Sequence, residues 1–203
     1  MTRLLLTRHG ETDWNLERRW QGHANRPLND LGREQARSLA ESLAARPIDA
    51  LYSSDLARAR ETAEIVGERI GLPVRLDPRL REVDVGEWSG LTSLEVEERF
   101  PAGLERRRAG STGWEQGEAY EAMGARVVAA LHEIAGAHPG ECVVVVTHGG
   151  PIGAVWLASG GERADWVHSA NCDLDEIAVE SGRVRWIHSV RGGGLHKQVQ
   201  GLA

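Results

Sequence analysis

The chain has 203 residues, of which 41% are apolar and 27% charged, and its formal net charge at pH 7 is -6. This composition is typical of a globular protein, and the negative charge argues against nucleic acid or an anionic membrane surface as its partner. No apolar run in the sequence approaches the ~20 residues of a membrane span. Two cysteines are too few for a disulfide framework, so we expect a cytoplasmic protein.

Strand and helix signals alternate along the chain. The segment 29–47 carries an apolar stripe at helical spacing, with Asn29 or Asp30 as its cap, and CVVVVT at 142–147 has the pattern of a strand buried on both faces. In chain order we expect a strand at 4–7, a helix within 29–47, a strand at 48–54, a helix at 56–71, a short strand at 72–78, a short helix at 92–101, a long helix at 119–140, a strand at 141–147, a helix at 151–159, and a hairpin of strands at 173–180 and 183–190.

This alternation predicts an α/β fold, a three-layer sandwich whose mostly parallel central sheet is flanked by helices. We find no internal repeat and no linker, so residues 1–203 are expected to form a single domain. Pro101 is expected to end the short helix, and residues 102–118 show no regular pattern. An irregular lid is therefore expected at about 91–118, and a Gly-rich C-terminal tail at about 191–203.

Conspicuous polar residues follow three of the expected strands. The first strand runs into Arg8-His9-Gly10, the second precedes the SSDLARARET segment, and the third ends at His148. The carboxyl ends of parallel strands meet at one edge of a sheet, where ligands bind in open α/β folds. A single histidine or arginine there is usually structural, and Ser53, Ser54 or Asp55 reads as a helix cap. Several converging cations, however, favour an anion site, and phosphate fits best.

Five segments together resemble the histidine phosphatase superfamily, whose members share the phosphoglycerate mutase-like fold. They are LLLTRHGETDWN, PLNDLGREQA, LYSSDLARARETAE, LREVDVGEWSGLT and VVTHGGPI, which follow the family's order and cover most of residues 3–155. The resemblance implies that His9 is the nucleophile that takes the phosphoryl group and that Glu82 protonates the leaving oxygen. It further implies a set of phosphate and substrate contacts: Arg8, Arg58, His148, Asn15, Gln21, Gly22 and Gly149.

From this resemblance we expect a phosphatase that hydrolyses small phosphomonoesters through a phosphohistidine, without a metal or other cofactor. Its partner would be a small phosphorylated metabolite, and a homodimer is left open. The alternatives are cofactor-dependent phosphoglycerate mutase-type transfer and a non-catalytic phospho-ligand-binding relative. The residues alone also permit a metal-dependent hydrolase that uses His9, His23 and His148, although their spacing gives only a weak metal signal.

Two side-chain assignments stay open in the sequence. Glu82 could instead pair with Arg79 or Arg81, and Asp84 or Glu87 could take its role as the acid. In the segment 106–108 three arginines are either a solvated basic patch or include one that reads a second anionic group on the substrate.

Overall fold

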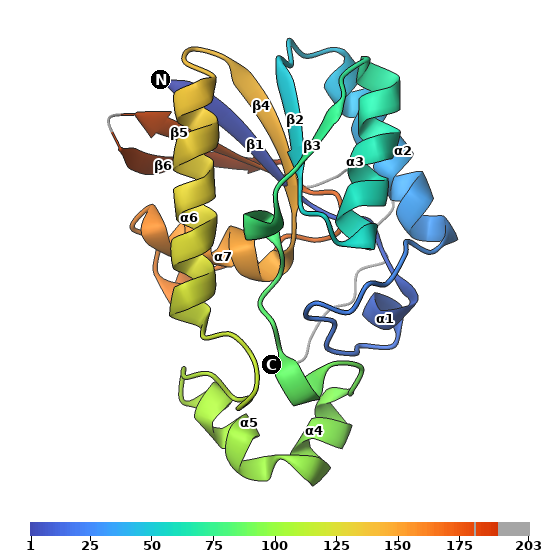
Figure 1. Ribbon diagram of the computed structural model, residues 1–203, viewed down its shortest axis with the longest axis vertical. Coiled ribbons are helices and arrows are strands. Elements are labelled where there is room, and N and C mark those ends of the chain that lie inside the picture. Colours follow the sequence, from blue (N-terminus) through green and yellow to red (C-terminus); the bar gives the residue numbers. More distant parts are fainter. Residues whose placement is uncertain (181, 191–203) are drawn as a thin grey trace.

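A six-stranded sheet with the order β3-β2-β4-β1-β5-β6 forms the centre of the molecule (Figure 1). The computed structural model describes residues 1–180 and 182–190. Within them, β1, β2, β3 and β4 pair in parallel, while β5 runs antiparallel to β1 and β6 antiparallel to β5. The strands are β1 Thr2–Arg8, β2 Ala50–Ser53, β3 Val74–Leu76, β4 Cys142–Thr147, β5 Leu174–Glu180 and β6 Arg183–Val190. The predicted mostly parallel sheet is confirmed.

Helices cover both faces of this sheet, as expected for a three-layer sandwich (Figure 1). Leu4 and Leu6 of β1 pack in the core that contains α6 and α7, whereas Leu5 packs in the core that contains α2 and α3. All six residues of β4 are buried, because this central strand faces helices on both sides. The helices of these layers are α2 Asp30–Ala44, α3 Ala57–Ile70, α6 Tyr120–Ala137 and α7 Gly149–Ala158.

The helix ends follow capping chemistry. The side chain of Asn29 caps α2 by accepting the amide hydrogen of Gly32, and α3 ends at Gly71, whose φ of 73° lies in the left-handed region that glycine adopts readily. The predicted side-chain cap of α3 is wrong. Its N-cap is Leu56, which makes no side-chain cap hydrogen bond. Ser54 and Asp55 have other partners, described below.

The expected irregular lid is largely helical. After α4 (Ser93–Arg99), Pro101 begins a further helix, α5 (Pro101–Arg108), and the two helices extend away from the sheet (Figure 1). Proline fits the first turn of a helix because the amide hydrogen that it lacks would have no partner there. The short helix therefore ends just before Pro101, as predicted, but the expectation of an irregular segment from residue 102 is wrong. The three arginines lie on the last turn of α5.

The remaining described elements are short. They are α1 Asp13–Leu16 and the 3₁₀ turns η1 Pro78–Leu80, η2 Gly86–Trp88 and η3 Arg163–Asp165. β5 and β6 form the expected hairpin, with Gly182 at a φ of 72°. The predicted tail at about 191–203 lies outside the described residues. Among the described helices, none combines the length and the apolar character needed to cross a membrane.

Candidate active site

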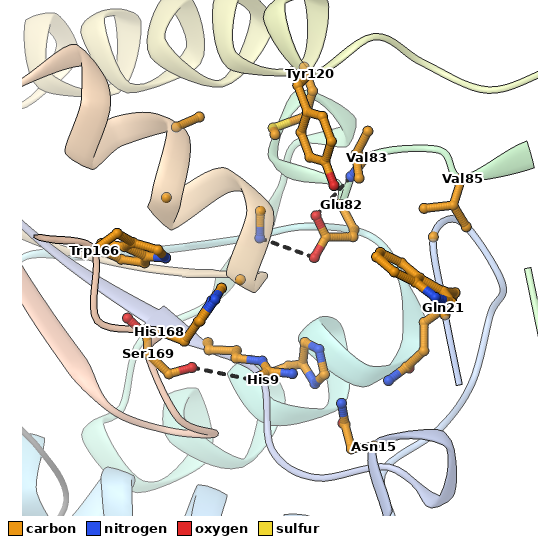
Figure 2. Close-up of a pocket in the computed structure, with 18 of the residues that line it drawn as sticks. His9, Asn15, Gln21, Glu82, Val83, Val85, Tyr120, Trp166, His168 and Ser169 are labelled. Carbon is orange, nitrogen blue, oxygen red and sulfur yellow. Dashed lines mark hydrogen bonds between the residues drawn. The ribbon is translucent and has the colours of Figure 1, made fainter. Parts of the chain in front are cut away.

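A cavity of about 650 Å³ opens where β1 and β4 end, and its lining includes Ser93 of α4 and Arg107 of α5. Figure 2 shows residues that line it. The parallel order of the strands brings together residues far apart in the chain. His9 directly follows β1, His148 directly follows β4, and Arg58 lies in the first turn of α3, which follows β2. The cavity lining contains every predicted site residue except His148: Arg8, His9, Asn15, Gln21, Gly22, Arg58, Glu82 and Gly149.

His9 lies in the cavity wall with only 3% of its surface exposed. Its ring Nδ1 lies 2.7 Å from the carbonyl oxygen of Gly10, an acceptor that places the ring proton on Nδ1. The other ring nitrogen, Nε2, therefore carries the lone pair, and Arg58 Nε donates to it at 3.2 Å. Burial lowers the pKa of His9 well below its usual value, and the charges of Arg58 and Arg8 lower it further. The imidazole is thus neutral at pH 7.

Two arginines flank His9, the buried Arg58 and the partly buried Arg8, and backbone carbonyls hold both. Arg58 donates to the carbonyl oxygens of Ala24 and Gly22, each at 2.9 Å, and Arg8 donates to that of Ser169 at 3.2 Å. Burial lowers the pKa of Arg58 to about 10, so this guanidinium remains charged at neutral pH. Within the described part of the chain, Arg8 Nε is buried without a hydrogen-bond partner. Carbonyls orient these cations without neutralising them, which leaves their charge for an anion in the cavity.

His148 lies behind the cavity wall. It is fully buried, and its ring centroid lies 5.1 Å from that of His9. Burial, followed by the charge of Arg58, lowers the pKa of His148 well below its usual value. The ring Nε2 contacts the Ser54 hydroxyl at 2.9 Å. His148 therefore lies beside His9, as the sequence predicts. Unlike the other predicted site residues, however, it lies behind the residues that line the cavity.

Glu82 is the single carboxylate among the described residues that line the cavity. Its two oxygens accept the amide hydrogens of Val83, at 2.9 Å, and of Gly150, at 3.2 Å (Figure 2). A Cβ at Gly150 would lie 2.2 Å from the carboxylate, so glycine is required for this approach.

The alternative partners and rivals of Glu82 lie elsewhere. Arg79 pairs with Asp77 and Glu133, and Arg81 pairs with Asp55. The rival acids bind backbone amides outside the cavity lining: Asp84 accepts from Gly86, and Glu87 accepts from Glu115 and Gln116. The geometry thus separates Glu82 from both rivals and from the predicted salt bridges.

The other predicted contact residues differ in how they present donors. In Asn15 the amide oxygen accepts from the Thr12 cap of α1, which leaves Nδ2 directed toward the cavity (Figure 2). Gln21 is 9% exposed, and its Oε1 has no partner among the described residues. Gly22 supplies a carbonyl to Arg58. Gly149 starts α7, and the nearest atom to a Cβ built there is Arg8 Nε, at 3.9 Å.

Several lining residues were missed by the sequence analysis. Tyr120 points into the cavity from the start of α6, and Trp166, His168 and Ser169 enter from the segment between α7 and β5 (Figure 2). Burial raises the pKa of the Tyr120 phenol, so its hydroxyl stays protonated at neutral pH. No motif marks these positions, since their chemistry depends on the long-range packing of two segments. In the described ranges we find no group of three or more potential metal ligands; His23 instead contacts the Glu82 carbonyl oxygen.

A neutral histidine flanked by fixed arginines at the edge of a parallel sheet is suited to enzymatic phosphoryl transfer, which depends on positioning and on positive charge around the phosphoryl oxygens. The family model described as "Histidine phosphatase superfamily (branch 1)" matches residues 4–190. The chain belongs to this family.

Named relatives support the assignment. A glucosyl-3-phosphoglycerate phosphatase of Mycolicibacterium vanbaalenii is 39% identical, with 83% of this chain and 84% of the relative covered. A probable phosphoglycerate mutase of Cronobacter sakazakii is 38% identical, with coverage of 100% and 98%. A solved structure of mycobacterial glucosyl-3-phosphoglycerate phosphatase with VO3 has a TM-score of 0.81 at 34% identity, covering 91% of this chain and 96% of that one. The expected family, fold and enzyme class, a phosphatase, are thus confirmed; the mutase matches the alternative left open above.

Proposed function

We propose that this protein hydrolyses small phosphomonoesters through a phosphohistidine at Nε2 of His9, without a metal or cofactor. The observation that supports this most directly is the orientation of the His9 ring. Its proton is held on Nδ1 by the Gly10 carbonyl, and its lone pair on Nε2 lies beside Arg58 at the cavity wall. A neutral imidazole in this orientation is a nucleophile, and an adjacent guanidinium places the phosphoryl group in front of it.

The reaction then proceeds in two displacements. In the first, a bond forms between His9 Nε2 and phosphorus as the bond from phosphorus to the ester oxygen breaks, and Glu82 supplies the proton that the leaving oxygen takes. In the second, Glu82 accepts a proton from water, whose oxygen attacks phosphorus and releases inorganic phosphate and neutral His9. Arg8 and Arg58 balance the charge of the phosphoryl oxygens in both steps, the role that metal ions take in other phosphoryl-transfer enzymes.

Hydrolysis is favoured over mutase-type transfer by the segment that follows Glu82. Mutases of this family carry an aromatic and basic stretch there, whereas this chain continues VDVGEWSG, which contains neither tyrosine nor a basic residue. The cavity of about 650 Å³ leaves room beside the phosphoryl site for a substrate larger than inorganic phosphate.

A single-domain chain, a cytoplasmic location and a homodimer remain predictions.

The purified protein is expected to hydrolyse p-nitrophenyl phosphate at an unchanged rate after treatment with EDTA. The positive charge at the phosphoryl group comes from arginines, which a chelator does not remove. Release of nitrophenol with and without EDTA, followed by addition of Mg²⁺ or Zn²⁺, measures this directly. Loss of activity with EDTA that a divalent ion restores would instead support the metal-dependent alternative.

The substrate class is proposed to be phosphate esters that carry a second anionic group, such as a carboxylate. Of the three arginines on the last turn of α5, only Arg107 lines the cavity, where its guanidinium carbon lies 5.0 Å from the ring centroid of Tyr120. Its Nε is buried, with no hydrogen-bond partner in the described residues. Arg106 instead donates to the Gly113 carbonyl, and Arg108 to Glu97. Arg107 is therefore the arginine of this turn best placed to bind the second anionic group of the substrate.

Arg107→Ala is expected to lower kcat/KM for 3-phosphoglycerate about tenfold more than for glycerol 3-phosphate, which has a hydroxymethyl group in place of the carboxylate. A partly exposed charge-assisted contact contributes ~1–2 kcal/mol, which corresponds to roughly this factor. Arg108→Ala is the matched control, because it removes the same charge from the same turn outside the cavity, and both substrates should keep their rates. An equal effect of Arg107→Ala on the two substrates would assign these arginines to a solvated patch.

A further inference from the structure

Ser54 connects His148 to the end of β2 in the fully buried layer behind the cavity. Both side chains have no exposed surface. The Ser54 hydroxyl oxygen lies 2.9 Å from His148 Nε2, and it also accepts the amide hydrogen of Leu56 at 3.3 Å. The family resemblance implies that His148 contacts the phosphoryl group, but it implies no role for Ser54.

The direction of the hydrogen bond between Ser54 and His148 follows from where the Ser54 hydroxyl proton can go. A serine hydroxyl has one hydrogen to donate and two lone pairs to accept with. Leu56 uses one lone pair, and the described contacts of Ser54 include no acceptor for its proton except His148 Nε2. Because leaving a buried hydroxyl proton unpaired costs free energy, Ser54 donates to Nε2. Nε2 is then the unprotonated nitrogen of the ring.

The opposite nitrogen of His148 must therefore carry the ring proton. Burial keeps His148 neutral by lowering its pKa, and a neutral imidazole has one N–H. Yet His148 Nδ1 is buried with no hydrogen-bond partner among the described residues. The cations that act on this ring are Arg58 and Arg8, and both line the cavity. An unpaired N–H in these surroundings lacks an acceptor, which an anion in the site would supply.

We propose that Ser54 is a positioning residue that holds His148 in the Nδ1–H tautomer, so that this N–H donates to a phosphoryl oxygen. The proposal rests on the proposed function for the identity of the anion. If the ring instead carried its proton on Nε2, the lone pair of Nδ1 would face the anion and repel it. Ser54 thus determines whether His148 attracts or repels the phosphoryl group.

The tautomer can be measured without any turnover. In protein labelled with ¹⁵N-histidine, we expect His148 to show a protonated Nδ1 and an unprotonated Nε2 near pH 7, with the signals assigned by comparison with a His148→Asn variant. Inorganic phosphate should shift the Nδ1 resonance. Ser54→Ala should abolish the exclusive Nδ1–H form. Ser53→Ala is the matched control, because Ser53 is equally buried but donates to the Ser54 carbonyl rather than to the ring, and it should leave the tautomer unchanged.

Kinetics give a second readout. In metal sites, loss of the hydrogen bond that orients a ligating histidine typically lowers activity by ~10–100-fold. By analogy, kcat/KM should fall by about this factor in Ser54→Ala and stay within about twofold in Ser53→Ala. A wild-type spectrum with the proton on Nε2 overturns the proposal, and this result does not depend on whether Ser54→Ala folds. Unchanged activity in folded Ser54→Ala also overturns it. A wild-type protein without phosphatase activity would contradict the proposed function, whereas the tautomer would still report on Ser54.

Discussion

His9→Ala is expected to lower kcat for every phosphomonoester, alkyl and aryl alike, by at least about a thousandfold. The proposed reaction forms its covalent intermediate on His9 Nε2, and removal of a nucleophile abolishes that path altogether. The cavity should nevertheless persist, since carbonyls of the surrounding loops hold Arg58 and Arg8. His9→Ala should therefore still bind inorganic phosphate, which separates loss of chemistry from loss of the site.

The intermediate itself gives the sharper measurement. After rapid mixing with ³²P-labelled substrate and quenching under alkaline conditions, label should remain on the wild-type protein, stable to base and labile to acid, as expected of phosphohistidine. Peptide mapping should place it on His9. His132→Ala, which removes a histidine of α6 outside the cavity lining, should label normally. Label on serine or aspartate, or an active His9→Ala variant, would reject this assignment.

The part of the site that the sequence predicts is the part tied to strand ends. Arg8 and His9 follow β1, and His148 follows β4, which pairs with β1 in parallel. Once the alternation of strands and helices indicates a parallel sheet, these residues must meet at one edge, whatever the details of packing. Arg58 joins them because α3 begins only a few residues after β2. Local pattern and topology together therefore place the cationic centre.

The outer wall of the cavity could not be predicted in this way. The segment AGLERRRAG has few apolar residues and two glycines, so its sequence resembles a loop, yet it is helical through Arg108. There Gly103 lies against Trp88 and the Gly113 carbonyl, positions at which a Cβ would come within 3.2 and 2.6 Å. This helix depends on tertiary contact rather than on local propensity. Which arginine of its last turn faces the cavity follows only from that packing.

Glu82→Gln is expected to lower kcat/KM for alkyl phosphates by ~10²–10⁴-fold, the usual contribution of general acid catalysis, and to affect p-nitrophenyl phosphate far less. An alkoxide needs a proton to leave, whereas nitrophenolate departs without one. kcat/KM is the informative constant, because it includes only the steps up to departure of the alcohol. kcat also contains hydrolysis of the phosphohistidine, a step that all substrates share and that Glu82 is proposed to assist.

Comparing alkyl with aryl phosphates also corrects kcat/KM for a structural effect of Glu82→Gln. Both oxygens of Glu82 accept backbone amide hydrogens, from Val83 and Gly150, and the amide group of glutamine can accept only one of them. The resulting displacement should slow all substrates alike, so the ratio between alkyl and aryl phosphates isolates the proton transfer. Asp84→Asn and Glu87→Gln remove the neighbouring carboxylates outside the cavity lining and should leave this ratio unchanged. A ratio that changes in either of these variants, but not in Glu82→Gln, would transfer the role of the acid to that residue.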